Sequence, residues 1–410
     1  MYISRTLEPT IQRASHQFPV VMITGARQVG KTTVLRHLAH QTSQNRNYVT
    51  LDDPTLLILA KEEPKLFLER FKPPLLIDEI QYAPGLLPYI KMNVDHRPKT
   101  GQYWLTGSQP FQLMRGISES LAGRVGILNL LGLSQWEMQK LSHLDAPFIP
   151  GDKSIEKKLT KMEPISLETI YKKIWYGSFP AIATDKHSDK NLFFSSYTQT
   201  YLQRDVRDLA QVGDESAFLR FLKVTAARTG QLLNLADIAR DTDISPNTAK
   251  HWLSILQTAG IIYLLEPYHS NLTKRLVKAP KLYYIDTGLC SYLTQWSDHK
   301  TLEAGAMSGA ILETFVVIEI LKSYWHNGLQ APLYFYRDKD KKEIDLLIVT
   351  NQKIYPVEIK KTASPTKEIL KNFKVLNQYQ ESPSQGVVVC FVDTLLPLSS
   401  HTDAIPIGLV

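Results

Sequence analysis

The residues best suited to chemistry form a loop with the spacing G-x-x-x-x-G-K-T near the start of the chain. Its two glycines let the backbone curl so that N–H groups can point at phosphate oxygens. The lysine would neutralise charge on the β- and γ-phosphates, and the first threonine hydroxyl would bind Mg²⁺. A β-branched run precedes the loop and a helical pattern follows it, which is the context that a nucleotide-binding loop requires. We therefore predict an ATP site made by Gly25, Ala26, Arg27, Gln28, Val29, Gly30, Lys31, Thr32 and Thr33.

The second group of candidate residues is the pair of acids Asp78 and Glu79, which end the mostly apolar run LLIDE. Such a near-continuous run is typical of a parallel strand that is covered on both faces. Asp78 would hold Mg²⁺ through water, and Glu79 is placed to polarise the attacking water as a general base. The later strand pattern YWLTGS ends in small polar residues, of which Thr106 or Ser108 would contact the γ-phosphate. A structural turn explains that last pattern nearly as well.

These motifs carry a family resemblance. GARQVGKTT, LLIDEIQ, WLTGS and SLAGR together resemble the prokaryotic AAA+ ATPases that pair an N-terminal ATPase domain with a C-terminal region of unknown function. The resemblance continues through RLVKAPKLYYIDTGL, KEIDLLI and PVEIKKT, so it covers nearly the whole chain. In AAA+ proteins an arginine from a neighbouring subunit often completes the site, which implies a homo-oligomer. Arg124 is the candidate and Arg115 the fallback, and a solvent-facing or salt-bridged arginine is the alternative for either.

From Leu232 the pattern predicts two short helices, with Ser245 as N-cap and Pro246 at the first position of the second helix. A strand and a basic segment follow, which together indicate a winged helix. The outward face of the second helix and the basic segment would contact DNA. The alternative is a winged helix that serves only as a lid or an interface. The predicted DNA-binding residues are Asn247, Lys250, His251, Lys274, Arg275, Lys278 and Lys281.

The last hundred residues resemble the PD-(D/E)xK nuclease core, with Asp345 on one strand and Glu358 and Lys360 on the next. Side chains alternate along a strand, so Glu358 and Lys360 share a face. Asp345 and Glu358 would bind Mg²⁺, Lys360 would orient the attacking water, and Glu313 would add a ligand from a helix. Pro356 inside the strand implies an edge or a bulge.

Charge counting favours a metal at this predicted site. Lys360 offsets one negative charge, so three acids facing one lysine leave a surplus that Mg²⁺ or Mn²⁺ would neutralise. The alternative is a retained fold without activity, in which the acids pair with Lys341, Lys360 or Lys361.

The elements that position these residues predict an α/β chain with four regions. These are a P-loop AAA+ ATPase core at 1–135, a helical region or lid at 136–225, a winged helix at 226–290 and an α/β restriction-endonuclease-like domain at 291–410. The chain has 410 residues, a net charge of +7 and two cysteines, which excludes a disulfide framework and permits a nucleic-acid partner. Because neither a signal peptide nor a membrane span is evident, we expect a cytoplasmic protein without a membrane partner.

Two functions are compatible with these patterns. The first is an ATP-hydrolysing AAA+ protein that uses ATP and Mg²⁺, binds DNA and carries a metal-dependent nuclease domain. The second is a nucleotide-switched interaction protein whose nuclease-like domain is catalytically inactive. An ATPase rate that DNA stimulates favours the first function, and a slow rate that is indifferent to DNA favours the second.

Overall fold

The computed structural model describes residues 2–41, 45–108, 120–184, 188–201, 214–269, 279–379 and 384–410. The chain divides into two compact units. The first unit is formed by Met1–Leu133 with the short pieces Thr258–Gly260 and Trp325–Leu329, and the second unit by the remainder. The four finer boundaries expected from the sequence stay a prediction.

The first unit contains a five-stranded sheet in the order β2-β3-β4-β1-β5. Every neighbouring pair is parallel, so the carboxyl ends of all five strands lie along one edge. Both the glycine-rich loop after β1 and the acids that end β3 therefore meet at that edge. The strands are β1 Val20–Thr24, β2 Asn47–Thr50, β3 Leu75–Asp78, β4 Tyr103–Gly107 and β5 Val125–Asn129.

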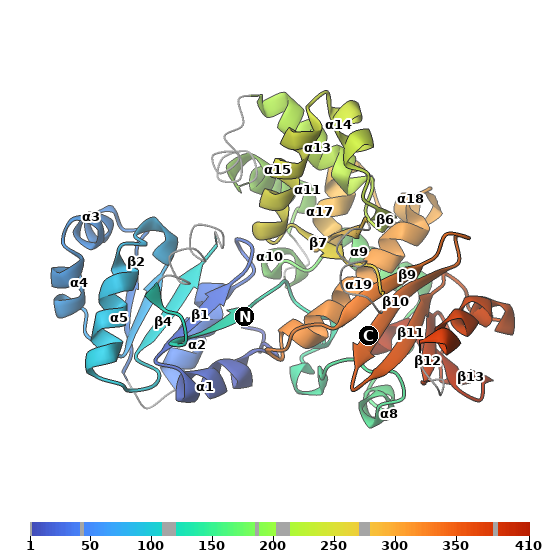
Figure 1. Ribbon diagram of the computed structural model, residues 1–410, viewed down its shortest axis with the longest axis horizontal. Coiled ribbons are helices and arrows are strands. Elements are labelled where there is room, and N and C mark those ends of the chain that lie inside the picture. Colours follow the sequence, from blue (N-terminus) through green and yellow to red (C-terminus); the bar gives the residue numbers. More distant parts are fainter. Residues whose placement is uncertain are drawn as a thin grey trace. The chain divides into compact units, whose positions relative to one another are not determined.

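Helices cover both faces of this sheet (Figure 1). Apolar side chains of α3, α4 and α5 pack in one core cluster with Val20 and Met22 of β1. Val21 and Ile23, which point the other way, are fully buried as well. The helices are α1 Glu8–Gln17, α2 Lys31–Gln41, α3 Pro54–Glu62, α4 Pro64–Arg70, the 3₁₀ turn η1 Ile80–Tyr82 and α5 Leu86–His96.

The second unit begins with helices, as the sequence predicts for this part of the chain. Side-chain caps explain several starts: Ser134 and Glu137 form a capping box on α7, and Asp152, Ser166 and Asp189 cap α8, α9 and α11. The elements are α7 Gln135–Met138, η2 Ser142–Leu144, α8 Lys153–Leu159, α9 Leu167–Tyr176, α10 Pro180–Ala183, α11 Lys190–Tyr197 and α13 Glu215–Ala226.

A three-stranded sheet and two short helices follow α13. The sheet has the antiparallel order β6-β8-β7. The predicted turn is present, because Asp243 adopts a left-handed conformation and Ser245 accepts a hydrogen bond from the Thr248 N–H at 3.1 Å. The elements are β6 Gln231–Leu232, α14 Leu235–Thr242, α15 Pro246–Thr258, β7 Ile262–Leu265 and β8 Lys281–Tyr284.

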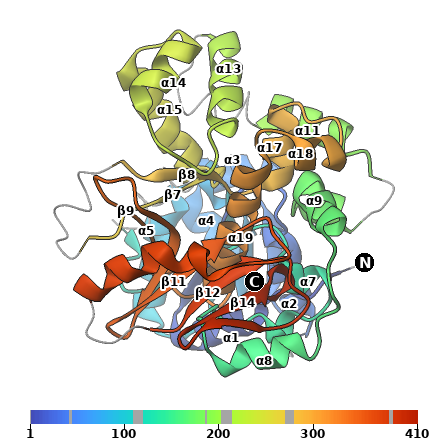
Figure 2. The same cartoon turned by 90° about the vertical axis from the view of Figure 1, so that its right-hand side faces the viewer.

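The C-terminal part is a six-stranded mixed sheet in the order β13-β14-β12-β11-β10-β9. β9, β10 and β11 form an antiparallel meander, and β12 joins β11 in parallel. Figures 1 and 2 show α19 between this sheet and the α13–α15 helices. The elements are α17 Thr287–Leu293, α18 His299–Ala304, α19 Ser308–Trp325, β9 Leu333–Arg337, β10 Glu343–Thr350, β11 Lys353–Ile359, η4 Lys367–Gln378, β12 Gly386–Cys390, β13 Leu396–Ser399, β14 Thr402–Pro406 and η5 Ile407–Leu409.

One expectation about this sheet is wrong. Pro356 was expected at an edge or a bulge, but β11 is an interior strand and Pro356 pairs with Leu347 in the β10 ladder. The parallel pairing with β12 covers only Val357 to Ile359, so Pro356 lies just before the segment that is paired on both sides. A proline is tolerated there because its missing N–H falls outside the doubly paired section.

Among the described residues, no helix is both long and apolar enough to cross a membrane.

Candidate functional site

The glycine-rich loop between β1 and α2 has the backbone of a phosphate-binding nest. Gln28 and Gly30 have positive φ values of 64° and 96°, and Gly25 has a φ of 143°. Alternation of left- and right-handed residues turns successive N–H groups toward one point. A β-carbon at Gly25 would lie 2.1 Å from the Leu130 carbonyl oxygen, so this position has no room for a side chain. The loop is therefore built for an anion at the start of α2.

Lys31, the first residue of α2, is buried, with 5% of its surface exposed. Its ammonium donates to the carbonyl oxygens of Gly25 at 3.1 Å and Ala26 at 2.8 Å. Burial lowers the pKa of Lys31 to about 8, although Glu79 and Asp78 oppose that shift. Weak neutral acceptors hold this cation, so a phosphate can replace them at small cost.

Asp78, at the end of β3, is held by hydroxyl groups. Its Oδ1 accepts hydrogen bonds from Thr32 at 2.6 Å and from Thr106 at 2.5 Å, and its Oδ2 accepts one from Tyr48 at 3.2 Å. The Thr32 hydroxyl and the Asp78 carboxylate are thus adjacent, as shared binding of Mg²⁺ requires. Hydroxyl and carboxylate oxygens are the ligands that Mg²⁺ prefers, so this pair fits the ion.

Glu79 follows Asp78 in a left-handed conformation, with a φ of 56°. Its N–H donates to the Thr106 hydroxyl at 3.0 Å, and its carboxylate accepts from Ser108 at 3.1 Å and from the Gln81 amide. Thr106 and Ser108 are both fully buried at the end of β4. The two residues expected to contact the γ-phosphate therefore contact the two acids.

Three residues of this site had no role in our sequence interpretation. Gln81 is buried and bridges Glu79 to Ser108, which it contacts at 3.1 Å. Tyr48 reaches Asp78 from β2, and Arg5 donates to the carbonyl oxygens of Val29 at 2.9 Å and Leu131 at 2.8 Å. Gln81 lies within the LLIDEIQ motif, so a polar residue without an assigned role was visible. Tyr48 and Arg5 carry no motif, and only the fold brings them to the site.

Arg124 lies at the opposite end of the sheet from the loop. It precedes β5, whose first residue pairs with Val20 at the start of β1. The length of β1 therefore separates Arg124 from its own loop, by on the order of 15 Å. The guanidinium forms a two-pronged ion pair with Asp95 at 2.5 and 3.1 Å, and both side chains are partly exposed. This geometry excludes contact with the nucleotide of the same chain. Arg115, the fallback, lies outside the described residues.

In the second unit the predicted nuclease residues do come together. Lys360 Nζ lies 2.8 Å from Glu358 Oε1 and 3.4 Å from Asp345 Oδ2. The Ile359 N–H also donates to Asp345, at 2.9 Å. Glu358 is buried, and its second oxygen has no hydrogen-bond partner. Burial and the charge of Asp345 raise the pKa of Glu358 to about 7.

One expectation about this region needs correction. Lys281, assigned to a DNA-contacting hairpin, has only 2% of its surface exposed and cannot meet a phosphate backbone. Its ammonium lies 2.9 Å from Glu313 and 2.6 Å from Glu343. With Lys281, two lysines stand against the three acids Glu313, Asp345 and Glu358, so the surplus of negative charge falls to one, and the metal site stays a prediction. Within the described ranges, no group of three or more His, Cys, Asp or Glu side chains is placed to hold a metal ion.

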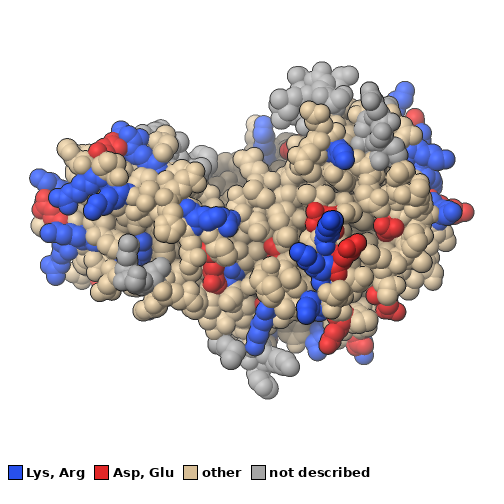
Figure 3. Space-filling view, turned by 90° about the horizontal axis from the view of Figure 1, so that it is seen from below, with Lys and Arg blue, Asp and Glu red and all other residues tan. Residues whose placement is uncertain are grey.

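The remaining predicted DNA contacts divide into two sets. Asn247, Lys250 and His251 are exposed on α15, while Ala249, Trp252 and Leu253 of the same helix are buried. The helix therefore turns a polar face outward, as predicted. On the face that Figure 3 presents, basic side chains stand among acidic ones. Lys274, Arg275 and Lys278 lie outside the described residues.

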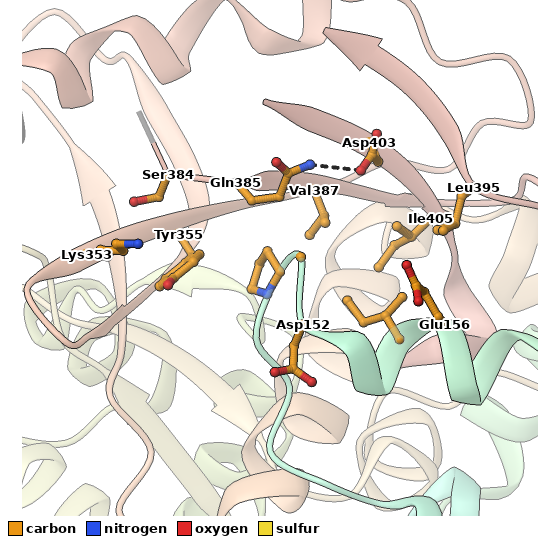
Figure 4. A pocket seen from close by; sticks show the side chains of 13 residues that line it. Asp152, Glu156, Lys353, Tyr355, Ser384, Gln385, Val387, Leu395, Asp403 and Ile405 are labelled. Atoms are coloured by element: carbon orange, nitrogen blue, oxygen red, sulfur yellow. Dashed lines mark hydrogen bonds between the residues drawn. The ribbon is translucent and has the colours of Figure 1, made fainter. Parts of the chain in front are cut away.

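A cavity of about 530 Å³ lies between the start of α8 and strands β11, β12 and β14 (Figure 4). Lys353 and Tyr355 line it, and strand alternation places them on the opposite face of β11 from Glu358. Two of its acids are already engaged: Asp152 caps α8, and Asp403 accepts a hydrogen bond from Gln385 at 2.8 Å. The cavity is thus separate from both clusters described above.

Comparison with known families agrees with the first site. Residues 17–139 match the AAA domain family, residues 167–300 match a domain of unknown function (DUF8612), and residues 308–410 match another (DUF4143). With the loop geometry above, these matches define the N-terminal part as an AAA-type P-loop ATPase domain, followed by a C-terminal DUF4143 domain.

Uncharacterised proteins of Mycobacterium tuberculosis and Mycobacterium bovis are 30% identical to the chain over 356 residues, which is 87% of this chain and 73% of each relative. The chain belongs to the family that these mycobacterial proteins represent.

Solved structures also resemble the chain, at low similarity. A Walker-type ATPase of Pyrococcus abyssi aligns with 70% of this chain and 94% of its own, at 13% identity and a TM-score of 0.43. One RuvB structure of Thermotoga maritima aligns with 64% of this chain and 89% of its own, at 16% identity and a TM-score of 0.31. AMPPCP-bound DnaA of Aquifex aeolicus aligns with 61% of this chain and 85% of its own, at 16% identity and a TM-score of 0.26.

Proposed function

We propose that this chain is a Mg²⁺-dependent ATPase in which Glu79 activates the attacking water. The observation that carries the proposal is the separation of charges at the first site. Lys31 is bonded to carbonyl oxygens, while Asp78 and Glu79 are bonded to hydroxyl and amide groups. Because the lysine and the acids do not neutralise each other directly, each can act on a ligand. Thr32 and Asp78 would hold Mg²⁺, which would supply positive charge to offset that of the phosphates.

Each side chain then has a distinct task. Lys31 exchanges its carbonyl partners for the β- and γ-phosphates, while Thr32 and Asp78 hold the ion. Glu79 accepts the proton of the water that attacks the γ-phosphorus. Thr106 fixes both acids, because its single hydroxyl donates to Asp78 and accepts from the Glu79 N–H. This shared hydroxyl would hold Glu79 at a fixed position relative to the ion that Asp78 binds.

Two substitutions test the proposal. Glu79→Gln keeps the shape and removes the base, so ATP binding should persist while hydrolysis falls at least ~10²-fold. Lys31→Ala should lose nucleotide binding. Glu62→Gln, an exposed glutamate on α3, is the matched control and should hydrolyse ATP at the unchanged rate. Single-turnover hydrolysis and binding of a fluorescent ATP analogue provide the two readouts. A wild-type rate in Glu79→Gln would show that the base is another group.

A second proposal is that α15 contacts DNA. The order α13, β6, α14, α15, β7, β8 supports the winged-helix interpretation, in which the helix at the position of α15 enters the major groove. Asn247, Lys250 and His251 lie exposed near the start of this helix. They would contact base edges and phosphates of duplex DNA.

The test of DNA contact is the salt dependence of binding. Lys250→Ala should reduce the slope of log K against log salt by ~0.9, which corresponds to one phosphate contact. Replacing Lys274, Arg275 and Lys278 together should remove up to three such contacts. Lys367→Ala, an exposed lysine of η4, is the control. An unchanged slope in both variants would leave the interaction-protein alternative, as would an ATPase rate that duplex DNA does not alter.

The C-terminal topology supports a PD-(D/E)xK-like fold, because an apolar helix precedes an antiparallel meander and a parallel strand. We propose that the domain has this fold but does not cleave phosphodiester bonds. The acids that would bind a catalytic metal are paired with lysines, which agrees with the alternative of a catalytically inactive nuclease-like domain.

A further inference from the structure

Strand β8 delivers two donors to one carboxylate of α19. Lys281 and Tyr283 are two residues apart and so share a face of the strand. The Lys281 ammonium is 2.9 Å from Glu313 Oε1, and the Tyr283 hydroxyl donates to the same oxygen at 2.6 Å. Lys281 is almost fully buried, so these contacts are shielded from solvent. The carboxylate of Glu313 is thereby satisfied from within the chain.

The same ammonium also reaches the six-stranded sheet. Lys281 Nζ is 2.6 Å from Glu343 Oε1 at the start of β10, and the other oxygen of Glu343 is 2.9 Å from Arg337 Nη1 on β9. One buried cation thus joins β8, α19 and β10.

The charges of the whole cluster nearly cancel. Two carboxylates face Lys281, and those of Asp345 and Glu358 face Lys360. With Arg337, three cations stand against four acids, which leaves one negative charge when all four acids are ionised. That is half of the charge that a divalent ion would neutralise. An ion held by Glu313 would also have to displace the buried ammonium of Lys281. Breaking such a buried pair is strongly unfavourable, because it leaves an uncompensated charge in a low-dielectric interior.

We infer that Lys281 is the resident cation of this acid cluster, which makes the cluster an ion-pair lock between β8, α19 and β10 rather than a divalent-metal site. The lock ties the three-stranded sheet to the six-stranded sheet. The inference does not depend on ATP hydrolysis, so the two can fail separately.

Calorimetric titration of Mn²⁺ tests the inference in the full chain. The protein carries Lys31→Ala, which removes nucleotide binding at the first site. We expect the same heats with and without Asp345→Asn, because no metal binds beside Asp345. Heats that disappear with Asp345→Asn would overturn the inference, whatever the outcome of the ATPase tests.

Removing the resident cation supplies the reciprocal test. Lys281→Met, in the same background, should create Mn²⁺ binding that requires Asp345, and should lower the unfolding temperature by ~5 °C or more. Lys367→Met is the matched exposed control and should do neither. The pair Lys281→Met with Glu313→Gln should recover part of the lost stability, because neither charge is then left alone. A folded Lys281→Met protein without the new Mn²⁺ site, or with unchanged stability, would overturn the inference.

Discussion

Lys31 in the first unit is bonded to the carbonyl oxygens of Gly25 and Ala26, whereas Lys281 in the second unit is bonded to the carboxylates of Glu313 and Glu343. Both lysines are buried, and both clusters combine two acids with a lysine. Burial lowers the pKa of Lys31, while direct ion pairs raise that of Lys281. The direction of the shift follows the partner.

The difference separates a binding site from a structural one. Neutral partners hold the first cluster, so its charges remain available to a nucleotide and its ion. Direct ion pairs offset most of the charge of the second cluster, which stabilises the fold and weakens the attraction for a ligand. Residue types alone do not distinguish these cases, since two acids and a lysine are present in each. What distinguishes them is which group lies within about 3 Å of each charge.

The largest expected effect concerns Arg124, and it tests whether the ATP site needs an arginine from a second chain. If Arg124 acts in trans, Arg124→Ala should lower ATP turnover by ~10³-fold, the value of an arginine finger in phosphoryl transfer. Hydrolysis per subunit should also rise with protein concentration in the wild type. Arg97→Ala, an exposed arginine nearby in the chain, is the control. A rate per subunit that stays constant at concentrations where the protein is monomeric would exclude the trans role.

A smaller loss is expected from Thr106→Val, which removes the hydroxyl that joins Asp78 to Glu79 without changing shape. Loss of a buried hydrogen bond of about 1.4–2.8 kcal/mol corresponds to a ~10- to 100-fold slower kcat. The KM for ATP should change little, since neither phosphate contact nor Lys31 is altered. Thr55→Val on the exposed side of α3 controls for the substitution. Unchanged kcat would mean that the acids hold their positions without Thr106.

The affinity for ATP should depend on pH through Lys31. The pKa of Lys31 is lowered to about 8, so the ammonium that attracts phosphate is lost as the pH rises through that value. Affinity should therefore be constant below pH ~7.5 and fall by up to tenfold per pH unit above ~8.5. Binding of an ATP analogue between pH 6.5 and 9.5 measures this. Lys31→Arg, which remains protonated, should remove the fall if it binds; a flat wild-type profile would contradict the assignment.

The smallest effect concerns stability and compares the two lysines directly. Lys31→Met should leave the unfolding temperature unchanged or raise it slightly, because burying an ammonium that only neutral carbonyl groups hold is costly. Lys281→Met should lower it, as described above. Calorimetric scans without nucleotide make the comparison. If both substitutions destabilise the protein equally, the distinction between an open and a closed cluster is wrong.

Much of the local structure could be read from the sequence. The apolar run before Gly25 predicted β1, Ser245 and Pro246 predicted the start of α15, and the apolar run around Asp345 predicted β10. Each signal is local, since it depends on residues a few positions apart. The nucleotide loop was equally readable because its spacing is a motif. The sequence does not predict the hydrogen bonds that Tyr48 and Thr106 donate to Asp78, because only the order of the strands in the sheet brings these three residues together.

The sequence by itself determined the chemistry that each segment carries. It placed Lys31 at the end of the glycine-rich loop and Asp78 and Glu79 at the end of a strand. It also placed Asp345, Glu358 and Lys360 on adjacent strands, because loop spacing and strand alternation are properties of neighbouring residues. The tertiary structure alone decided which charges meet. Lys281 belongs by sequence to a basic segment, yet its strand pairs into a sheet that carries it beside Glu313 and Glu343. Electrostatic energy depends on distance and burial, and only the folded chain fixes those.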